Sequence, residues 1–192
     1  WGLDVSRFGN DKTALCKRQG SVVTEIRSWS GLDLMQTVGR VVAEYDSLQP
    51  SRRPREILID SIGLGSGVVD RLREIGLPVR GVNVAEAPSM GETYLNLRSE
   101  LWFKTKAWFE DRACKLPKDD QLVAELTGIR YSFTSSGKMK AESKDEMRKR
   151  GLASPDLADA LCLTMASDAA TALSGAFTSW RGEIKRNLRG IA

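Results

Sequence analysis

The chain has 192 residues, enough for one sizeable domain, and its 41% hydrophobic and 28% charged residues are an ordinary globular balance. The net charge of +4 permits a nucleic-acid partner without requiring one. Histidine is absent, which excludes Ser-His-Asp and Cys-His catalysis, HExxH zinc sites and histidine-based nucleases, and leaves carboxylates, lysine, arginine, hydroxyl groups or a metal ion.

The first residue, the lengths of the apolar runs and the cysteines indicate what kind of chain this is. The chain opens at Trp1 rather than at a methionine, so we expect a fragment of a longer protein, cut just before a first strand. No apolar run approaches the roughly 20 residues of a membrane span. The three cysteines are widely spaced and form no CxxC pattern, which predicts reduced thiols in a cytosolic protein.

The first half of the chain predicts a strand meander followed by alternating helices and strands. Strand patterns occur in "WGLDVS", "TALCKR" and "SVVTEIRSW". Apolar spacing predicts a helix over 32–48. The run "ILID" at 57–60 is typical of a buried parallel strand. The glycine-rich "SIGLGSG" is interpreted as a tight turn, followed by a helix at "VVDRLREIG" and a strand at "VRGVNV".

The second half predicts a long helix over about 94–113 and a hairpin over 129–142. "SKDE" at 143–146 is a capping-box pattern that opens a short basic helix, and Ser154 suits the N-cap of a last helix. We expect one domain over 1–170 and a flexible basic tail over 171–192. The order of elements predicts an α/β fold whose mixed central sheet has three antiparallel strands followed by parallel strands.

Four aspartates draw attention in this framework. Asp4 interrupts an apolar strand, Asp60 ends a strand, and Asp159 lies in an apolar run one turn after Asp156. Active sites of open α/β sheets gather at the carboxyl ends of strands. Buried acids without a cation partner are costly, and Mg²⁺ or Mn²⁺ would resolve that cost. Two such ions ~3.5–4 Å apart can hold the attacking and leaving oxygens of a phosphodiester.

Each aspartate also has an ordinary structural interpretation. Asp4 could face solvent, Asp60 could cap the following turn, and Asp156 could be a first-turn acid favoured by the helix dipole. Asp159 is the hardest to explain in this way, because it lies inside an apolar stretch. "GLGSG" lacks the lysine of a phosphate-binding P-loop.

Four stretches in order, "GLDVSRFGNDKTAL", "ILIDSIGLGSGVVDRL", "YLNLRSELWF" and "ESKDEMRKRGLASPDLADALCL", resemble the nuclease domain of the large terminase subunit of tailed bacteriophages. The resemblance covers roughly residues 2 to 167, and its last stretch is the most specific. It implies a ribonuclease H-like fold and two-metal cleavage of concatemeric viral double-stranded DNA during genome packaging, in the host cytoplasm. It also implies an N-terminal ATPase motor domain, absent from this fragment, which contains no Walker motif.

The resemblance assigns roles to individual residues. Asp4, Asp60 and Asp159 would be catalytic ligands of two Mg²⁺ or Mn²⁺ ions, and Asp156 a secondary acid near the second ion. Lys144 would offset the negative charge of the phosphate. The implied partners are double-stranded DNA, the ATPase domain in cis, the small terminase subunit and the portal, with no membrane.

A basic cluster suits contacts with the DNA backbone, although solvated surface charges are an equal interpretation for any single member. Its members are Lys138, Lys140, Lys144, Arg148, Lys149 and Arg150. Arg98 is expected to pair with Glu100 or with an active-site acid. Trp102 and Trp108 are expected to be packing residues.

Two other functions remain open from the sequence. A junction resolvase or integrase of the same fold would use the same strand-end aspartates, although "SKDEMRKRGLASPDLADAL" favours a terminase. A non-enzymatic module could instead use the basic tail to dock on a partner such as the viral portal.

Overall fold

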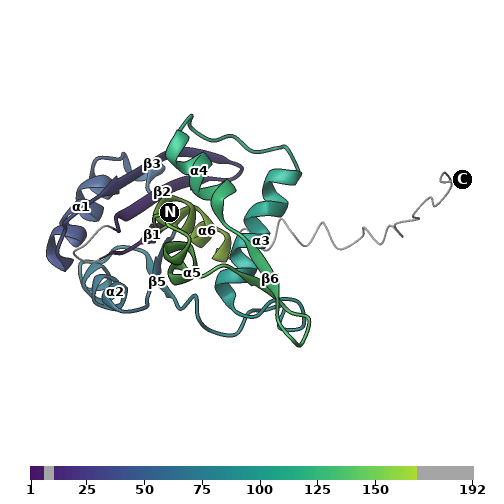
Figure 1. Cartoon of the computed structure of the whole chain (residues 1–192). Coiled ribbons are helices and arrows are strands. Elements are labelled where there is room, and N and C mark those ends of the chain that lie inside the picture. The colour runs from purple at the N-terminus through teal and green to yellow at the C-terminus, as the bar shows by residue number, and fades with distance from the viewer. Residues whose placement is uncertain (7–10, 168–192) are drawn as a thin grey trace, which may run out of the picture.

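The computed structural model describes residues 1–6 and 11–167 (Figure 1). The strands are β1 Gly2–Asp4, β2 Thr13–Gln19, β3 Val22–Trp29, β4 Ile57–Asp60, β5 Val79–Val82, β6 Tyr131–Phe133 and β7 Met139–Ala141. The helices are α1 Leu34–Asp46, α2 Leu64–Glu74, α3 Leu97–Glu110, α4 Asp120–Gly128, α5 Lys144–Lys149 and α6 Asp156–Leu163, with single 3-10 turns at Pro50–Arg52 and Thr164–Ala166. Within these residues every helix is too short or too polar to span a lipid bilayer.

The main sheet has five strands in the order β3-β2-β1-β4-β5, and β6 pairs with β7 in a separate hairpin. Neighbours are antiparallel from β3 to β1 and parallel from β1 through β4 to β5, which confirms the predicted mixed sheet. Leu3 lies beside Ile59 in the parallel pair. Asp4 and Asp60, the next residue on each strand, therefore leave the sheet side by side at its carboxyl edge.

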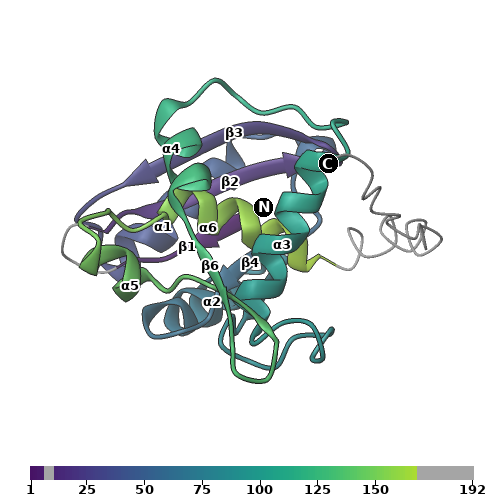
Figure 2. The same cartoon turned by 45° about the vertical axis from the view of Figure 1, so that its right-hand side comes forward.

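Helices cover both faces of the sheet (Figure 2). Leu3, Leu15 and Ile57 pack with α1 and α2 on one face. Ala14 and Cys16 face the other side, where they pack against α3, α4 and α6. Because side chains alternate along a strand, Asp4 points away from Leu3 and toward the α6 side.

Helix α6 is buried along its whole length, between the sheet and α3 with α4. Its contact with β1 is close, because a Cβ added to Gly2 would lie 2.1 Å from the carbonyl oxygen of Ala160. Glycine at this position therefore lets the backbone of α6 lie directly on the strand that ends in Asp4. The acids of the helix and of the strand consequently share one edge of the molecule.

The start of α2 differs from the prediction. The tight-turn interpretation of "GLGSG" was wrong, because α2 begins at Leu64 within it. A Cβ on Gly65 would lie 1.6 Å from the carbonyl oxygen of Asp60, so the glycine allows the helix to start against the end of β4. The turn is confined to Ile62 and Gly63, just before the helix, and Gly63 has a φ of 63°.

Three further predictions can be compared with the described chain. The hairpin is confirmed, and its turn contains Gly137 with a φ of 80°. Helix α4 was not predicted, because its nine residues are too few to show a clear helical period. Helix α6 begins at Asp156, and Ser154 binds the side chain of Asp156 instead of capping the helix. The predicted tail over 171–192 lies outside the described residues.

Gly2→Ala should destabilise the fold by about 2 kcal/mol or more, because the added methyl group collides with backbone that cannot rotate away. Gly39→Ala is the matched control, since a Cβ at this helical glycine meets nothing within 4 Å. That substitution should instead stabilise the protein by about 0.5–1 kcal/mol. Urea unfolding measures both changes, and a Gly2→Ala variant as stable as the parent would show that α6 does not pack this closely.

Candidate functional site

Lys144 lies among three buried aspartates that come from two distant parts of the chain. Its Nζ is 2.8 Å from Asp4 Oδ2, 3.3 Å from Asp156 Oδ1 and 3.5 Å from Asp159 Oδ2. The aspartate side chains are only 6%, 5% and 10% exposed, and that of Lys144 is 31% exposed. Buried charges need partners. Lys144 is therefore a cation that all three acids share.

The local sequence places Lys144 at the start of α5. Ser143 caps α5, accepting a hydrogen bond from the backbone N–H of Glu146, while the Glu146 side chain accepts from the backbone N–H of Ser143. This reciprocal pair is the predicted capping box, now confirmed. It makes Lys144 the first residue of α5 and holds the base of its side chain beside the acids.

The acids and the lysine change one another's proton affinity. Burial raises the pKa of Asp4 to about 7; Lys144 opposes this shift, and the charges of Asp159 and Asp156 add to it. Burial also works against the charge of Lys144, but attraction to Asp4, Asp159 and Asp156 outweighs burial and raises the pKa of Lys144 above its ordinary value. Lys144 therefore remains an ammonium at neutral pH.

Asp60 joins this group from the neighbouring strand. Burial raises the pKa of Asp60, while the backbone N–H of Ile62, which donates to its Oδ1 at 3.1 Å, opposes the shift. The turn-capping interpretation thus holds for one oxygen. Among the described residues, no donor reaches the other oxygen of Asp60 or Oδ1 of Asp4. Within the described part of the chain, both oxygens remain available to a further ligand.

Asp159 is held by two donors from α3. The indole N–H of Trp102 donates to its Oδ1 at 2.8 Å, and Nη2 of Arg98 lies 3.1 Å from the same oxygen. Arg98 thus pairs with an acid of the cluster, one of its two predicted partners; Glu100 is instead fully buried against Ser89 and Lys104.

The hydrogen bond from Trp102 to Asp159 was not predicted from the sequence. Trp102 is a packing residue as predicted, but it is also a donor to the cluster. Its position four residues after Arg98, on the same helix face, was the available signal.

Asp156 accepts a short hydrogen bond from the protein on each of its two oxygens. The backbone N–H of Lys12 donates to its Oδ2 at 2.7 Å, and the hydroxyl of Ser154 donates to its Oδ1 at 2.5 Å. Neither donor was predicted from the sequence. One of them is a backbone N–H, which any residue could supply. With fewer unused lone pairs, Asp156 suits a supporting role better than a leading one.

The predicted basic cluster is partly neutralised. Lys140 pairs with Glu146 at 2.7 Å, Arg148 with Asp11 at 2.5 Å and Arg150 with Glu142 at 2.5 Å. Lys138 and Lys149 form no ion pair within the described part of the chain. Lys144 is the fourth member with acidic partners, so a phosphate backbone would meet two lysines without an ion pair among the described residues and four paired basic groups.

The donor set suits a hard divalent cation, but the side chains do not yet form a metal cage. Carboxylate oxygens are the ligands that Mg²⁺ and Mn²⁺ prefer. In the described ranges, however, no three histidine, cysteine, aspartate or glutamate side chains are arranged to hold a metal ion. The ammonium of Lys144 lies between three of the acids. A cation therefore fits the charge of the site, provided that Lys144 moves aside.

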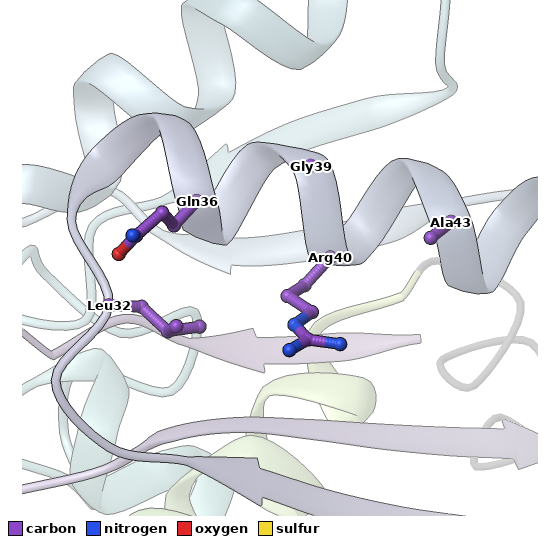
Figure 3. Close-up of a pocket in the computed structure, with 5 residues that line it drawn as sticks. All are labelled: Leu32, Gln36, Gly39, Arg40 and Ala43. Carbon is purple, nitrogen blue, oxygen red and sulfur yellow. The ribbon is translucent and has the colours of Figure 1, made fainter.

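Two hollows of the surface lie elsewhere. A shallow groove along α1 is lined by Leu32, Gln36, Gly39, Arg40 and Ala43 (Figure 3). An apolar groove between α3, α4 and β6 is larger, about 550 Å³, and Trp102 forms part of its wall. Neither groove contains a carboxylate of the cluster.

The architecture is that of the predicted ribonuclease H-like fold. The nuclease domain of the large terminase subunit gp2 of bacterial virus Sf6 has a TM-score of 0.73 at 24% identity, covering 86% of each chain. A lysine-to-alanine mutant of that domain, solved with manganese and β-thujaplicinol, has a TM-score of 0.73 at 23% identity over the same shares.

A second solved nuclease extends the comparison to another virus. The large terminase nuclease of thermophilic phage G20c, solved with magnesium, has a TM-score of 0.62 at 18% identity, covering 84% of this chain and 77% of that one. No protein-family model and no curated protein matches the sequence. These likenesses confirm the fold that the resemblance implied.

Asp4→Asn should stabilise the metal-free protein at neutral pH. The pKa of Asp4 is about 7 in the fold and 3.8 in the unfolded chain, so the unfolded chain loses this proton first as the pH rises. The stability of the parent should therefore fall relative to Asp4→Asn between about pH 4 and pH 7, and the difference should stay constant above that range.

Melting temperatures in EDTA from pH 4 to 8 test this expectation. Asp70→Asn is the matched control, because that side chain is 78% exposed on α2. Its difference from the parent should not grow with pH. A difference between Asp4→Asn and the parent that is independent of pH would contradict the raised pKa.

Proposed function

We propose that this chain is a metal-dependent endonuclease that cleaves concatemeric viral double-stranded DNA during genome packaging. The observation that carries the proposal is the convergence of Asp4, Asp156 and Asp159 around Lys144, with Asp60 at the end of the adjacent parallel strand. The likeness to phage large terminase nucleases, some of them solved with manganese or magnesium, supports it.

Asp4, Asp60 and Asp159 would hold two Mg²⁺ or Mn²⁺ ions, with Asp156 in support. Bound there, the ions would supply the Lewis acidity for phosphodiester hydrolysis. The open oxygens of Asp4 and Asp60 are the ones available without breaking a hydrogen bond. The ammonium of Lys144 and a divalent ion would compete for the same carboxylates, so Lys144 must swing toward the substrate when the site is loaded.

When a metal ion displaces it from the acids, Lys144 would take on a second role. Once its ammonium leaves the acids, it remains a compact positive charge beside them on the first residue of α5. A lysine in this place binds a phosphate as a point charge and offsets the charge that develops during cleavage. Its stem is fixed at the backbone by the capping box, so only the side chain has to move.

The DNA backbone would pass over the hairpin and α5. Ser132 pairs with Lys140 in the hairpin, while Phe133 pairs with Met139, so the lysine and the aromatic ring lie on opposite faces. Lys140 reaches Glu146 on α5, which brings that basic face next to the helix that begins with Lys144. The partners we propose are a motor ATPase domain, the small terminase subunit and the portal, and the proposed location is the host cytoplasm.

One experiment separates this function from its alternatives. Purified protein is incubated with supercoiled plasmid, linear duplex and a four-way junction, each in Mg²⁺, Mn²⁺ or EDTA. We expect cleavage of plasmid and linear duplex with either metal and none in EDTA. Cleavage confined to the junction would favour a resolvase, and DNA binding without cleavage under any condition would favour a docking module.

Asp4→Asn, Asp60→Asn and Asp159→Asn should each reduce plasmid cleavage by at least about 100-fold, because each removes a charged metal ligand. Circular dichroism should show an intact fold in all three. Asp70→Asn, at the exposed position on α2, should cut at the parental rate. A folded variant among the three that cuts normally would remove that aspartate from the proposed site.

Lys144→Ala should tighten Mn²⁺ binding and yet slow cleavage at saturating Mn²⁺ by about 10- to 100-fold. The reason is that the lysine competes with the metal in the free protein and assists the phosphate in the complex. Calorimetry and plasmid cleavage measure the two effects separately. Lys118→Ala, at an exposed lysine, serves as the control. Weaker Mn²⁺ binding by Lys144→Ala would contradict competition between the ammonium and the metal.

DNA binding should be weak and strongly dependent on salt, with little sequence preference, because the free basic groups can reach only the phosphate backbone. Replacing Lys138 and Lys149 together by alanine should reduce the slope of log affinity against log salt by about 2. Fluorescence anisotropy with labelled duplexes of two unrelated sequences measures this. A defined footprint, or affinity that ignores salt, would count against backbone-only recognition.

A further inference from the structure

We propose that Arg98 and Trp102 are positioning residues that orient the carboxylate of Asp159, so that Oδ2 is the oxygen presented to a divalent metal ion. The proposal rests on the proposed metal-dependent function and adds to it the residues that prepare one ligand. Arg98 and Trp102 act on the metal only through Asp159.

The bond from Trp102 is short and buried. Trp102 is 7% exposed, and its indole N–H reaches Asp159 Oδ1 at 2.8 Å. A buried indole N–H needs an acceptor, and a buried carboxylate needs donors. The pairing satisfies both groups and leaves the indole ring to pack in the core and against the apolar groove.

Arg98 contacts both oxygens of the Asp159 carboxylate. One terminal nitrogen, Nη2, lies 3.1 Å from Oδ1 and 3.4 Å from Oδ2 of Asp159. The other, Nη1, donates to the carbonyl oxygen of Glu142 at 2.5 Å. The guanidinium also lies over the ring of Trp102, 5.6 Å from its centroid. Arginine can make these contacts together because its donors form a rigid planar fork.

The donors are distributed unequally between the two oxygens of Asp159. Oδ1 receives the short bonds from Trp102 and Arg98. Among residues 1–6 and 11–167, Oδ2 has only longer contacts, 3.4 Å to Arg98 and 3.5 Å to Lys144. Rotation of the carboxylate would break the Trp102 bond, so Oδ2 stays directed at the space that Lys144 occupies. That oxygen is the one left for a cation when the ammonium moves away.

Arg98 also joins Asp159 to the segment that carries Lys144. Glu142, whose carbonyl accepts from Arg98, precedes Lys144 by two residues, and Ala141 donates its backbone N–H to the hydroxyl of Ser99 at 3.0 Å. The first turn of α3 therefore fixes both the helix that supplies Asp159 and the chain that leads into α5. The relative placement of acid and lysine depends on this turn.

Trp102→Phe is the sharpest test, because it keeps an aromatic ring and removes only the indole donor. We expect Mn²⁺ affinity, measured by calorimetry without DNA, to fall about tenfold, within the range for partners that orient metal ligands. Cleavage at limiting Mn²⁺ should fall similarly and recover to within about twofold at saturating Mn²⁺, because the ligand itself is intact. Trp108→Phe, which also packs against this core, should change neither measurement.

Arg98→Lys provides a second variant that keeps the charge. A single ammonium cannot bind Asp159 and Glu142 together, so we expect a loss of Mn²⁺ affinity at least as large as the tenfold loss expected for Trp102→Phe. A melting temperature in EDTA within a few degrees of the parent would show that the loss is local. If Arg98→Lys binds Mn²⁺ as the parent does, charge alone suffices and the positioning role of Arg98 is wrong.

The indole resonances give a readout independent of activity. In an ¹H–¹⁵N spectrum, the Trp102 indole signal, assigned as the one absent from Trp102→Phe, should shift when Mg²⁺ is added. In Asp159→Asn the signal should not respond to Mg²⁺. A parent that binds no metal would overturn the proposed function and this inference together. Metal binding with parental affinity by Trp102→Phe would overturn the inference alone.

Discussion

The ion cluster of Lys144 with Asp4, Asp156 and Asp159 is the interaction on which the rest of the site depends. Three nearly buried carboxylates would repel one another and lose their hydration without a cation among them. Lys144 supplies that cation at 2.8–3.5 Å, and attraction to the acids holds its proton firmly. Burial, with the charges of Asp159 and Asp156, raises the pKa of Asp4 although Lys144 opposes the shift, and four aspartates share only Lys144 and Arg98 as cations among the described residues. The fold therefore retains an excess of negative charge that a further cation can relieve.

Backbone packing makes this cluster possible. Asp4 and Asp60 share an edge because β1 and β4 are parallel neighbours in register. Asp159 reaches the same edge only because α6 lies directly on β1, and Gly2 provides the space for that approach. A larger residue at Gly2 would separate the helix from the strand and the acids from one another. A glycine with no side-chain chemistry of its own thus sets the distances between the acids.

The sequence was most informative where the chemistry of a residue conflicts with its surroundings. Asp4, Asp60 and Asp159 were recognisable because a carboxylate at a strand end or in an apolar helix needs an explanation. The alternation of strands and helices likewise predicted the sheet. Helix α4 and the start of α2 were not predictable in this way, because nine weakly patterned residues and a glycine run carry little periodic signal. The contacts of Lys12 and Ser154 with Asp156 depend on tertiary packing, which no local pattern encodes.

The arrangement of donors around the acids explains why the four aspartates are not equivalent. Both oxygens of Asp156 accept hydrogen bonds from the protein. Asp4 and Asp60, in contrast, each have one oxygen without a donor among the described residues. Asp159 is intermediate, because Trp102 and Arg98 saturate one oxygen and leave the other with long contacts. A carboxylate held in this way loses little rotational freedom when it binds a cation. Structural hydrogen bonds therefore prepare the oxygens that they do not themselves use.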